Sequence, residues 1–192
     1  MPNETKTKAR SAKAAKKESV QEEVIYQTVE EINEEPGKAK PVVKQVDLSE
    51  LIPVRNGYQG RLVYKSTRTH EKFVWPEFGD EQMVELLELR NAKNTWKKYF
   101  INNWFMFDEE YAWVTDYLGL GQYYKYAIQI DSFDDLFEKT PQEIEDVVSK
   151  LSSGQKKSVG YRARQLIAED GIDSNKAIAA LEKALGIELV ER

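Results

Sequence analysis

Basic and aromatic side chains alternate over a stretch of about twenty residues near the middle of the sequence. Cations beside rings can hold a phosphate backbone and stack bases, so this pattern raises nucleic-acid binding as one hypothesis. The same alternation arises in any half-buried sheet whose rings face the core and whose cations face water. We favour the sheet, because no groove-reading motif or basic recognition helix accompanies the pattern. The residues concerned are Arg55, Tyr58, Arg61, Tyr64, Lys65, Arg68, His70, Lys72, Phe73 and Trp75.

Two further basic clusters follow, and we interpret both as solvated helix faces. The first lies beside Trp96 and Tyr99. The second lies within residues 156–164, and the acidic residues that follow it reduce its local positive charge. Helices of this kind can contact phosphates. The first cluster is Arg90, Lys93, Lys97 and Lys98. The nucleic-acid alternative would use Arg61, Lys65, Arg68, Lys72, Lys156, Lys157, Arg162 and Arg164.

The sequence offers little material for catalysis. It has no cysteine, which excludes disulfides, zinc fingers and thiol chemistry. His70 is its one histidine and falls in a predicted hairpin loop, where a solvent-exposed role is expected. Carboxylates at Asp131, Asp134, Asp135 and Glu138 fit an ordinary amphipathic turn. With no calcium-loop, Walker or dinucleotide pattern, we predict a non-enzymatic protein with no catalytic residue, cofactor or metal.

Charge and hydropathy exclude several classes of protein. The 192 residues carry a net charge of −5, which argues against a general nucleic-acid coat or an anionic-membrane binder. No apolar run approaches the roughly 20 residues that span a bilayer. The lysines near the N-terminus precede no apolar stretch, so no signal peptide is expected.

Residues 1–50 are predicted to form a charged, flexible arm and linker. Residues 1–19 contain six basic residues, and residues 20–35 contain six glutamates. The first part has too few apolar side chains to offset the entropy of ordering. A loose apolar stripe over 20–32 predicts a short helix, and residues 38–46 are expected to be extended.

An aromatic-rich α+β domain is predicted over residues 51–130. Of 21 aromatic residues, 19 lie between Tyr58 and Phe137. Alternation predicts a β-hairpin, and capping signals predict three helices after it. The strands are expected at 58–65 and 71–75, and the helices from Asp80, at about 95–107 and at 109–118, with a further strand possible at 123–130.

Residues 131–192 are predicted to form a small helical bundle. Thr140 and Glu143 make a capping box with Pro141 at the first helical position. Ser152 or Ser153 and Asp173-Ser174 start two more helices. The predicted fold class is therefore α+β: a β-hairpin or small antiparallel sheet with packed helices, then a C-terminal three-helix bundle, with a disordered or extended N-terminal arm.

The aromatic residues fit either a core or an interface, because large rings dominate both. The run 102–107 is unusually apolar, and we interpret it as a core helix with an exposed edge. The hypothesis of a partner-binding surface uses Tyr58, Arg61, Tyr64, Trp75, Trp96, Trp104 and Trp113.

Several short runs resemble small proteins of tailed bacteriophages of Gram-positive hosts. Most lie within residues 54–126, and another group lies within 151–185. The resemblance implies a structural, virion-associated role with other phage structural proteins as partners, and it implies no catalytic residue. The location that it implies is a virion or the host cytoplasm. The runs are Val54-Arg55-Asn56-Gly57, Phe78-Gly79-Asp80-Glu81-Gln82, Glu88-Leu89-Arg90-Asn91-Ala92-Lys93, Asn103-Trp104-Phe105-Met106-Phe107, Gln155-Lys156-Lys157 and Ile172-Asp173-Ser174.

The leading hypothesis is a virion-associated protein that attaches to a larger assembly through its arm and its aromatic-rich domain. A charged arm that orders on its partner can cover a large surface. One alternative is a nucleic-acid or transcription-associated binding module. Another is an inhibitor that binds one host protein through Trp96, Trp104 or Trp113.

Overall fold

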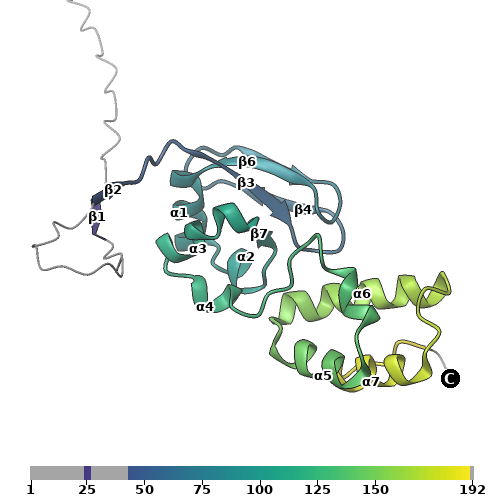
Figure 1. Cartoon of the computed structure of the whole chain (residues 1–192). Coiled ribbons are helices and arrows are strands. Elements are labelled where there is room, and N and C mark those ends of the chain that lie inside the picture. Colours follow the sequence, from purple (N-terminus) through teal and green to yellow (C-terminus); the bar gives the residue numbers. More distant parts are fainter. Residues whose placement is uncertain (1–23, 27–42, 191–192) are drawn as a thin grey trace, which may run out of the picture. The chain divides into compact units, whose positions relative to one another are not determined.

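The computed structural model describes residues 24–26 and 43–190 (Figure 1). The chain divides into two compact units, residues 1–48 and residues 49–192. In the first unit, strand β1 (Val24–Tyr26) pairs antiparallel with β2 (Val43–Gln45). The helix predicted over 20–32 is thus wrong at residues 24–26. The rest of the predicted arm up to residue 42 lies outside the described residues.

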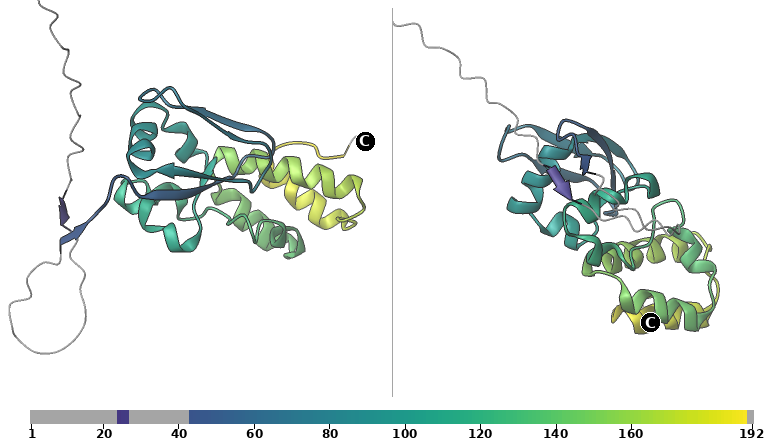
Figure 2. Two further views of the ribbon diagram at one scale, coloured as in Figure 1. Left: turned by 90° about the horizontal axis from the view of Figure 1, so that it is seen from above. Right: turned by 60° about the vertical axis from the view of Figure 1, so that its left-hand side comes forward.

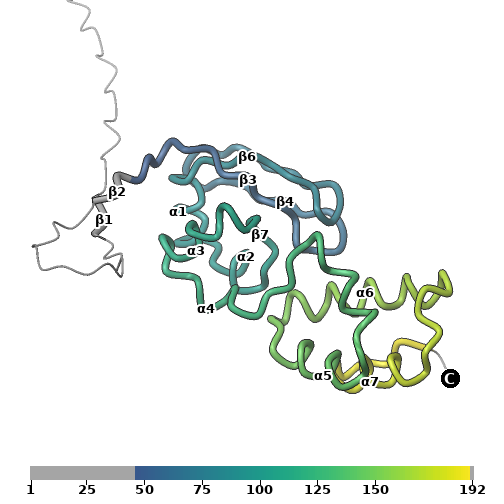
Figure 3. Tube along the Cα trace, in the orientation of Figure 1, coloured from purple at the N-terminus to yellow at the C-terminus, as the bar shows by residue number. Residues whose placement is uncertain are grey.

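The second unit contains a three-stranded antiparallel sheet with the order β6-β3-β7. Its members are β3 (Leu51–Asn56), β6 (Glu81–Glu85) and the short β7 (Phe105–Met106). The central strand β3 pairs with β6 from Leu51↔Glu85 to Arg55↔Glu81. The traces of β3 and β6 run side by side in Figure 3.

Strand β6 corrects the helix predicted from Asp80, because α1 (Leu86–Thr95) begins six residues later. Gly79 has φ +83, which turns the chain, and the Asp80 carboxylate accepts a bond from the Glu77 amide instead of capping a helix. The amide of Asn56 then donates to the Asp80 carbonyl and leads the chain into the ladder. Pairing with β3 therefore makes residues 81–85 a strand and not the start of a helix.

The predicted hairpin is confirmed as β4 (Leu62–Lys65) and β5 (Lys72–Trp75), in the register Leu62↔Trp75. Its inward rings build the core of this part of the chain. Trp75 is fully buried and its indole donates to the Val54 carbonyl at 2.7 Å. Phe105 lies 5.4 Å from Trp75 between ring centroids and 5.7 Å from Tyr64.

Short helices lie on one side of the β3–β6 ribbon (Figure 1). They are α1, α2 (Lys98–Ile101), α3 (Trp113–Tyr117) after the 3-10 turn η1 (Glu109–Tyr111), and α4 (Gly121–Tyr124). The predicted helix at 109–118 is broadly confirmed.

Two other expectations for this region are wrong. The helix predicted over 95–107 stops at Ile101, because Asn103 takes the left-handed conformation with φ +53 and the chain then enters β7. The strand suggested at 123–130 does not form. There the side chain of Gln155 accepts from the amide of Ile128 and donates to its carbonyl, which satisfies the backbone without a neighbouring strand.

The C-terminal three-helix bundle is confirmed as α5 (Pro141–Lys150), α6 (Ser153–Ala168) and α7 (Asn175–Leu185), preceded by the 3-10 turn η2 (Asp134–Glu138). All three helices gather around one apolar cluster (Figure 2). Thr140 forms both bonds of its capping box. Ser152 and Ser174 accept from the third amide of their helices, as N-caps do. The fully buried members of the cluster include Ile144, Val148, Val159, Ala163 and Leu181.

Close contacts join α6 to the aromatic-rich part within the second unit. The hydroxyl of Ser158 is buried and donates to the Gly57 carbonyl at 3.0 Å. A Cβ on Gly154 would lie 2.1 Å from the carbonyl oxygen of Asn102, so only glycine fits there. The bundle therefore packs on the sheet-containing part. No helix in the described part of the chain combines the length and apolar character that crossing a membrane requires.

Candidate functional site

The first candidate site is a surface of three rings around one lysine, with a fourth ring beside them. The ammonium of Lys98 lies 5.4 Å from the ring centroid of Trp96, 5.9 Å from Tyr99 and 5.8 Å from Trp104. Tyr58 extends the group, with its ring 5.9 Å from Trp104 in an edge-to-face arrangement. We call these five residues the lysine–aromatic surface. A cation within about 6 Å of a ring face is attracted by the ring quadrupole, so Lys98 is held among the rings.

Short, rigid elements position this surface. The hydroxyl of Tyr99 donates to the Val63 carbonyl at 2.6 Å, and burial raises the pKa of this phenol above its usual value. The carbonyl of Trp104 accepts from the amide of Gly57. Trp96 nevertheless keeps 45% of its surface exposed and Tyr58 keeps 37%. Exposed aromatic rings held on a fixed backbone are typical of binding hot spots.

Further cations and apolar groups come from the neighbouring segments. Lys97 lies 5.3 Å from the ring of Tyr123, and Lys125 lies 5.2 Å from the ring of Tyr126. Ile101, at the end of α2, is 37% exposed. Lysine ammonium groups and apolar rings are thus presented together, which suits a partner that carries carboxylates beside apolar side chains.

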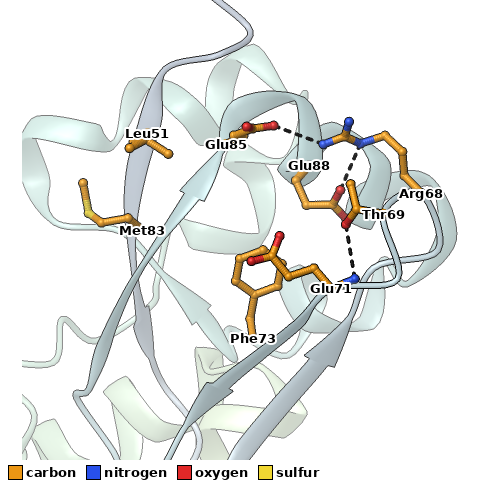
Figure 4. Close-up of a pocket in the computed structure, with 8 residues that line it drawn as sticks. All are labelled: Leu51, Arg68, Thr69, Glu71, Phe73, Met83, Glu85 and Glu88. Carbon is orange, nitrogen blue, oxygen red and sulfur yellow. Dashed lines mark hydrogen bonds and ion pairs between the residues drawn. The ribbon is translucent and has the colours of Figure 1, made fainter. Parts of the chain in front are cut away.

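The second candidate site is a pocket of about 260 Å³ where β5 and β6 diverge (Figure 4). Its apolar wall consists of Leu51, Phe73 and Met83. Its polar rim comes from the hairpin loop, β6 and α1. The rim residues are Arg68, Thr69, Glu71, Glu85 and Glu88.

A buried carboxylate holds the rim in place. Glu88 is 2% exposed and accepts bonds from the Tyr64 hydroxyl at 2.6 Å, from Asn91 at 3.0 Å and from the Nε of Arg68 at 3.1 Å. Burial acts to raise the pKa of Glu88, but the bonds from Tyr64, Asn91, Ser66 and Arg68 outweigh it and leave that pKa lowered. Burial and the ionised Glu88 also raise the pKa of the Tyr64 phenol.

The guanidinium of Arg68 joins the buried carboxylate of Glu88 to the exposed carboxylate of Glu85. It also pairs with Glu85 at 3.1 Å. The carboxylate of Glu71 points into the pocket above the ring of Phe73 (Figure 4) and has no bonding partner within residues 49–190. The pocket therefore presents three carboxylates against one guanidinium.

A separate ion-pair group lies near the C-terminal end of β3. Arg55 pairs with Asp108 at 3.1 Å and with Asp131 at 2.8 Å. The bond to Asp131 is the main reason that the pKa of Arg55 is raised, and the Arg55 guanidinium lowers the pKa of Asp131 in turn. Because both carboxylates are bonded to the guanidinium, we assign this group to stability. The described residues contain no group of three or more side chains arranged to hold a metal ion.

The structure separates the residues of the predicted partner-binding surface. Tyr58, Trp96 and Trp104 come together on the lysine–aromatic surface. Tyr64 and Trp75 are core residues, 1% and 0% exposed, so neither can contact a partner in this fold. Arg61 is exposed at the start of the hairpin, and Trp113 is half-buried with its ring 6.3 Å from Tyr117.

The residues of the nucleic-acid alternative are scattered, and three of them bond within the protein. Arg68 is held by Glu85 and Glu88, as described above. Arg162 makes a two-pronged contact with Asp134, which raises its pKa, and Arg164 donates to the Glu188 carbonyl. Lys65 and Lys72 are cross-strand neighbours on the hairpin. Arg61, Lys65, Lys72 and Lys157 are exposed, and Lys156 is half-buried.

Of the residues that line the pocket, the sequence singled out only Arg68 and Phe73 as candidates. Leu51 and Met83 lie on β3 and β6, where one strand was overlooked and a helix was expected. One signal was present. Glu88 interrupts the apolar run Leu86-Leu87-Leu89, and Asn91 follows one helical turn later. A carboxylate inside an apolar helix stripe indicates a paired, buried charge.

No protein-family model matches the chain, and neither a curated protein nor a solved structure matches it.

Proposed function

We propose that this chain is a non-enzymatic attachment protein of a tailed-phage virion, and that it binds an acidic segment of another structural protein. The observation that carries the proposal is the position of Lys98 among three rings, one of which, Trp96, is nearly half exposed. Trp and Tyr side chains form the centre of many protein interfaces, and the lysine among them adds attraction to a carboxylate. The assignment to a phage virion rests on the resemblance of the sequence runs.

A protein partner is favoured over nucleic acid by the charges. The chain has a net charge of −5, so long-range attraction to a polyanion is weak. Arg68, Arg162 and Arg164 each bond to groups within the protein. A local patch of Lys97, Lys98 and Lys125 suits a short acidic segment better than an extended phosphate backbone.

The test is incorporation into particles in the cells that naturally make the chain. Virions would be purified after nuclease treatment and probed for tagged protein carrying Trp96→Ala, Lys98→Glu or the control Lys150→Glu. Lys150 is an exposed lysine at the end of α5 and has no recorded contact with these rings. We expect Lys150→Glu to be incorporated normally and the two surface variants to be lost at least about tenfold, as for interface hot spots.

The results separate the alternatives. Equal incorporation of all three variants would refute attachment through this surface. Co-purification that disappears with nuclease would support the nucleic-acid alternative. A complex of fixed stoichiometry with one host protein, and none with virions, would favour the host-protein inhibitor.

A further inference from the structure

The pocket between β5 and β6 has the size and lining of a receptor for one long cationic side chain. Its apolar wall includes two side chains that are unusually exposed for their type, Leu51 at 53% and Met83 at 48%. Both lie on the β3–β6 ribbon, and Phe73 contributes a ring from the opposite strand (Figure 4). An aliphatic stem laid along this wall would remove that apolar surface from water.

The charge of the rim selects a cation for the head of that side chain. Arg68 is already bonded to Glu85 and Glu88, whereas Glu71 points into the pocket above Phe73 without a bonding partner in residues 49–190. A cation placed there would meet a carboxylate and lie over a ring face, and these two attractions act together. A guanidinium fits better than an ammonium, because it is planar, stacks on rings and pairs with carboxylates in two-pronged geometry.

The strands beside the pocket favour a polypeptide as the source of that side chain. Within the described sheets, β5 pairs with β4 alone and β6 pairs with β3 alone, so each strand has one edge without a ladder. Both strands contribute residues to the lining of the pocket. Unpaired strand edges offer amides and carbonyls to an extended segment, which is a common mode of peptide recognition.

We propose that this pocket binds an arginine side chain of a partner polypeptide, with its stem against Leu51 and Met83 and its guanidinium between Glu71 and Glu85 above the Phe73 ring. This site is distinct from the lysine–aromatic surface and would remain if that surface had another role. The pocket would bind a cation, whereas the lysine–aromatic surface would bind an acidic segment, so the two sites would contact different parts of a partner.

The test is an NMR titration of the full-length, ¹⁵N-labelled chain with a capped pentapeptide, acetyl-Gly-Val-Arg-Val-Gly-amide. The matched control peptide has citrulline at the centre, which keeps the shape of arginine and removes its charge. We expect chemical-shift changes at the residues that line the pocket. The citrulline peptide should bind at least about fivefold more weakly, as the loss of a cation–ring contact and an ion pair implies.

Two protein variants sharpen the result. Glu71→Gln removes the unpaired carboxylate and should weaken binding about threefold, as for a partly exposed ion pair. Glu81→Gln, four residues from Glu85 on the same strand, lies outside the pocket lining and should leave binding unchanged. Agmatine, a small molecule with a guanidinium and an ammonium but no peptide backbone, should bind more weakly than the peptide because it makes no contact with the strand edges.

Several outcomes would overturn the proposal. Equal binding of the arginine and citrulline peptides would show that the pocket does not select a cation. Shift changes outside the pocket, or equal binding by the Glu71→Gln and Glu81→Gln variants, would place the peptide elsewhere. Agmatine that binds as tightly as the peptide would make this a site for small amines and remove the polypeptide from the proposal.

Discussion

Replacing Glu88 by glutamine should destabilise the fold at neutral pH. The bonds that the carboxylate accepts include three from Tyr64, Asn91 and Arg68, at 2.6 to 3.1 Å. Glutamine keeps one oxygen, which can continue to accept from Tyr64 and Asn91. Its amide group then faces the Nε–H of Arg68, where two donors meet. One charge-assisted bond is lost and two become neutral, so we expect a loss of about 2 kcal/mol of unfolding free energy.

The pH dependence of this effect has a definite sign. The pKa of Glu88 in the fold is lowered from its ordinary 4.5. A carboxylate of this kind contributes stability above its unfolded pKa, and that contribution is lost as the pH falls through the folded pKa. The stability difference between wild type and Glu88→Gln should therefore be full at pH 7 and should shrink below about pH 4.

Urea unfolding followed by circular dichroism at both pH values measures this difference. Thermal unfolding at pH 7 should show a Tm lower by about 4–8 °C, given the length of the chain. Glu110→Gln is the control, because Glu110 is exposed on η1. A Glu88→Gln variant within about 0.5 kcal/mol of wild type at pH 7 would refute the assignment of a stabilising, ionised Glu88. A gap that stays constant on acidification would refute its lowered pKa.

Three further predictions concern other parts of the fold. Because the pKa of the Tyr64 phenol is raised from 10.0, its contribution is present below pH 10 and is lost as the pH rises further, so Tyr64→Phe should reduce the alkaline loss of stability seen in urea titrations. Gly154→Ala should cost at least about 2 kcal/mol in the same assay, because its Cβ would meet the Asn102 backbone, whereas Ser153→Ala should cost much less. Removing residues 1–45 should leave the native circular-dichroism spectrum but abolish incorporation into virions; normal incorporation would contradict a role for the arm.

The C-terminal helices show what local sequence determines. Thr140 with Glu143, Ser152, Ser174 and the left-handed Gly186 all act where the sequence places them. Helix caps involve residues three or four positions apart, so their signals are complete within one segment. The hairpin was predictable for the same reason, because its two strands are joined by one short loop.

The sheet could not be predicted in this way. Strand β6 follows a convincing capping signal at Asp80, and β7 lies in an apolar run that suits a helix. Both become strands because they pair with β3, which is more than twenty residues away along the chain. Long-range pairing overrides local preference, and nothing within either segment reports its partner.

The candidate sites divide along the same line. The order of residues in the sequence determined that aromatic residues concentrate in one part of the chain and that lysines lie among them. The tertiary structure decided that Trp75 is buried while Trp96 is exposed, although the two side chains have the same chemistry. It also brought Glu71, from the hairpin loop, and Glu85, from β6, to one pocket. Burial and proximity across the chain depend on how the elements pack, and that packing is settled only when every segment is in place.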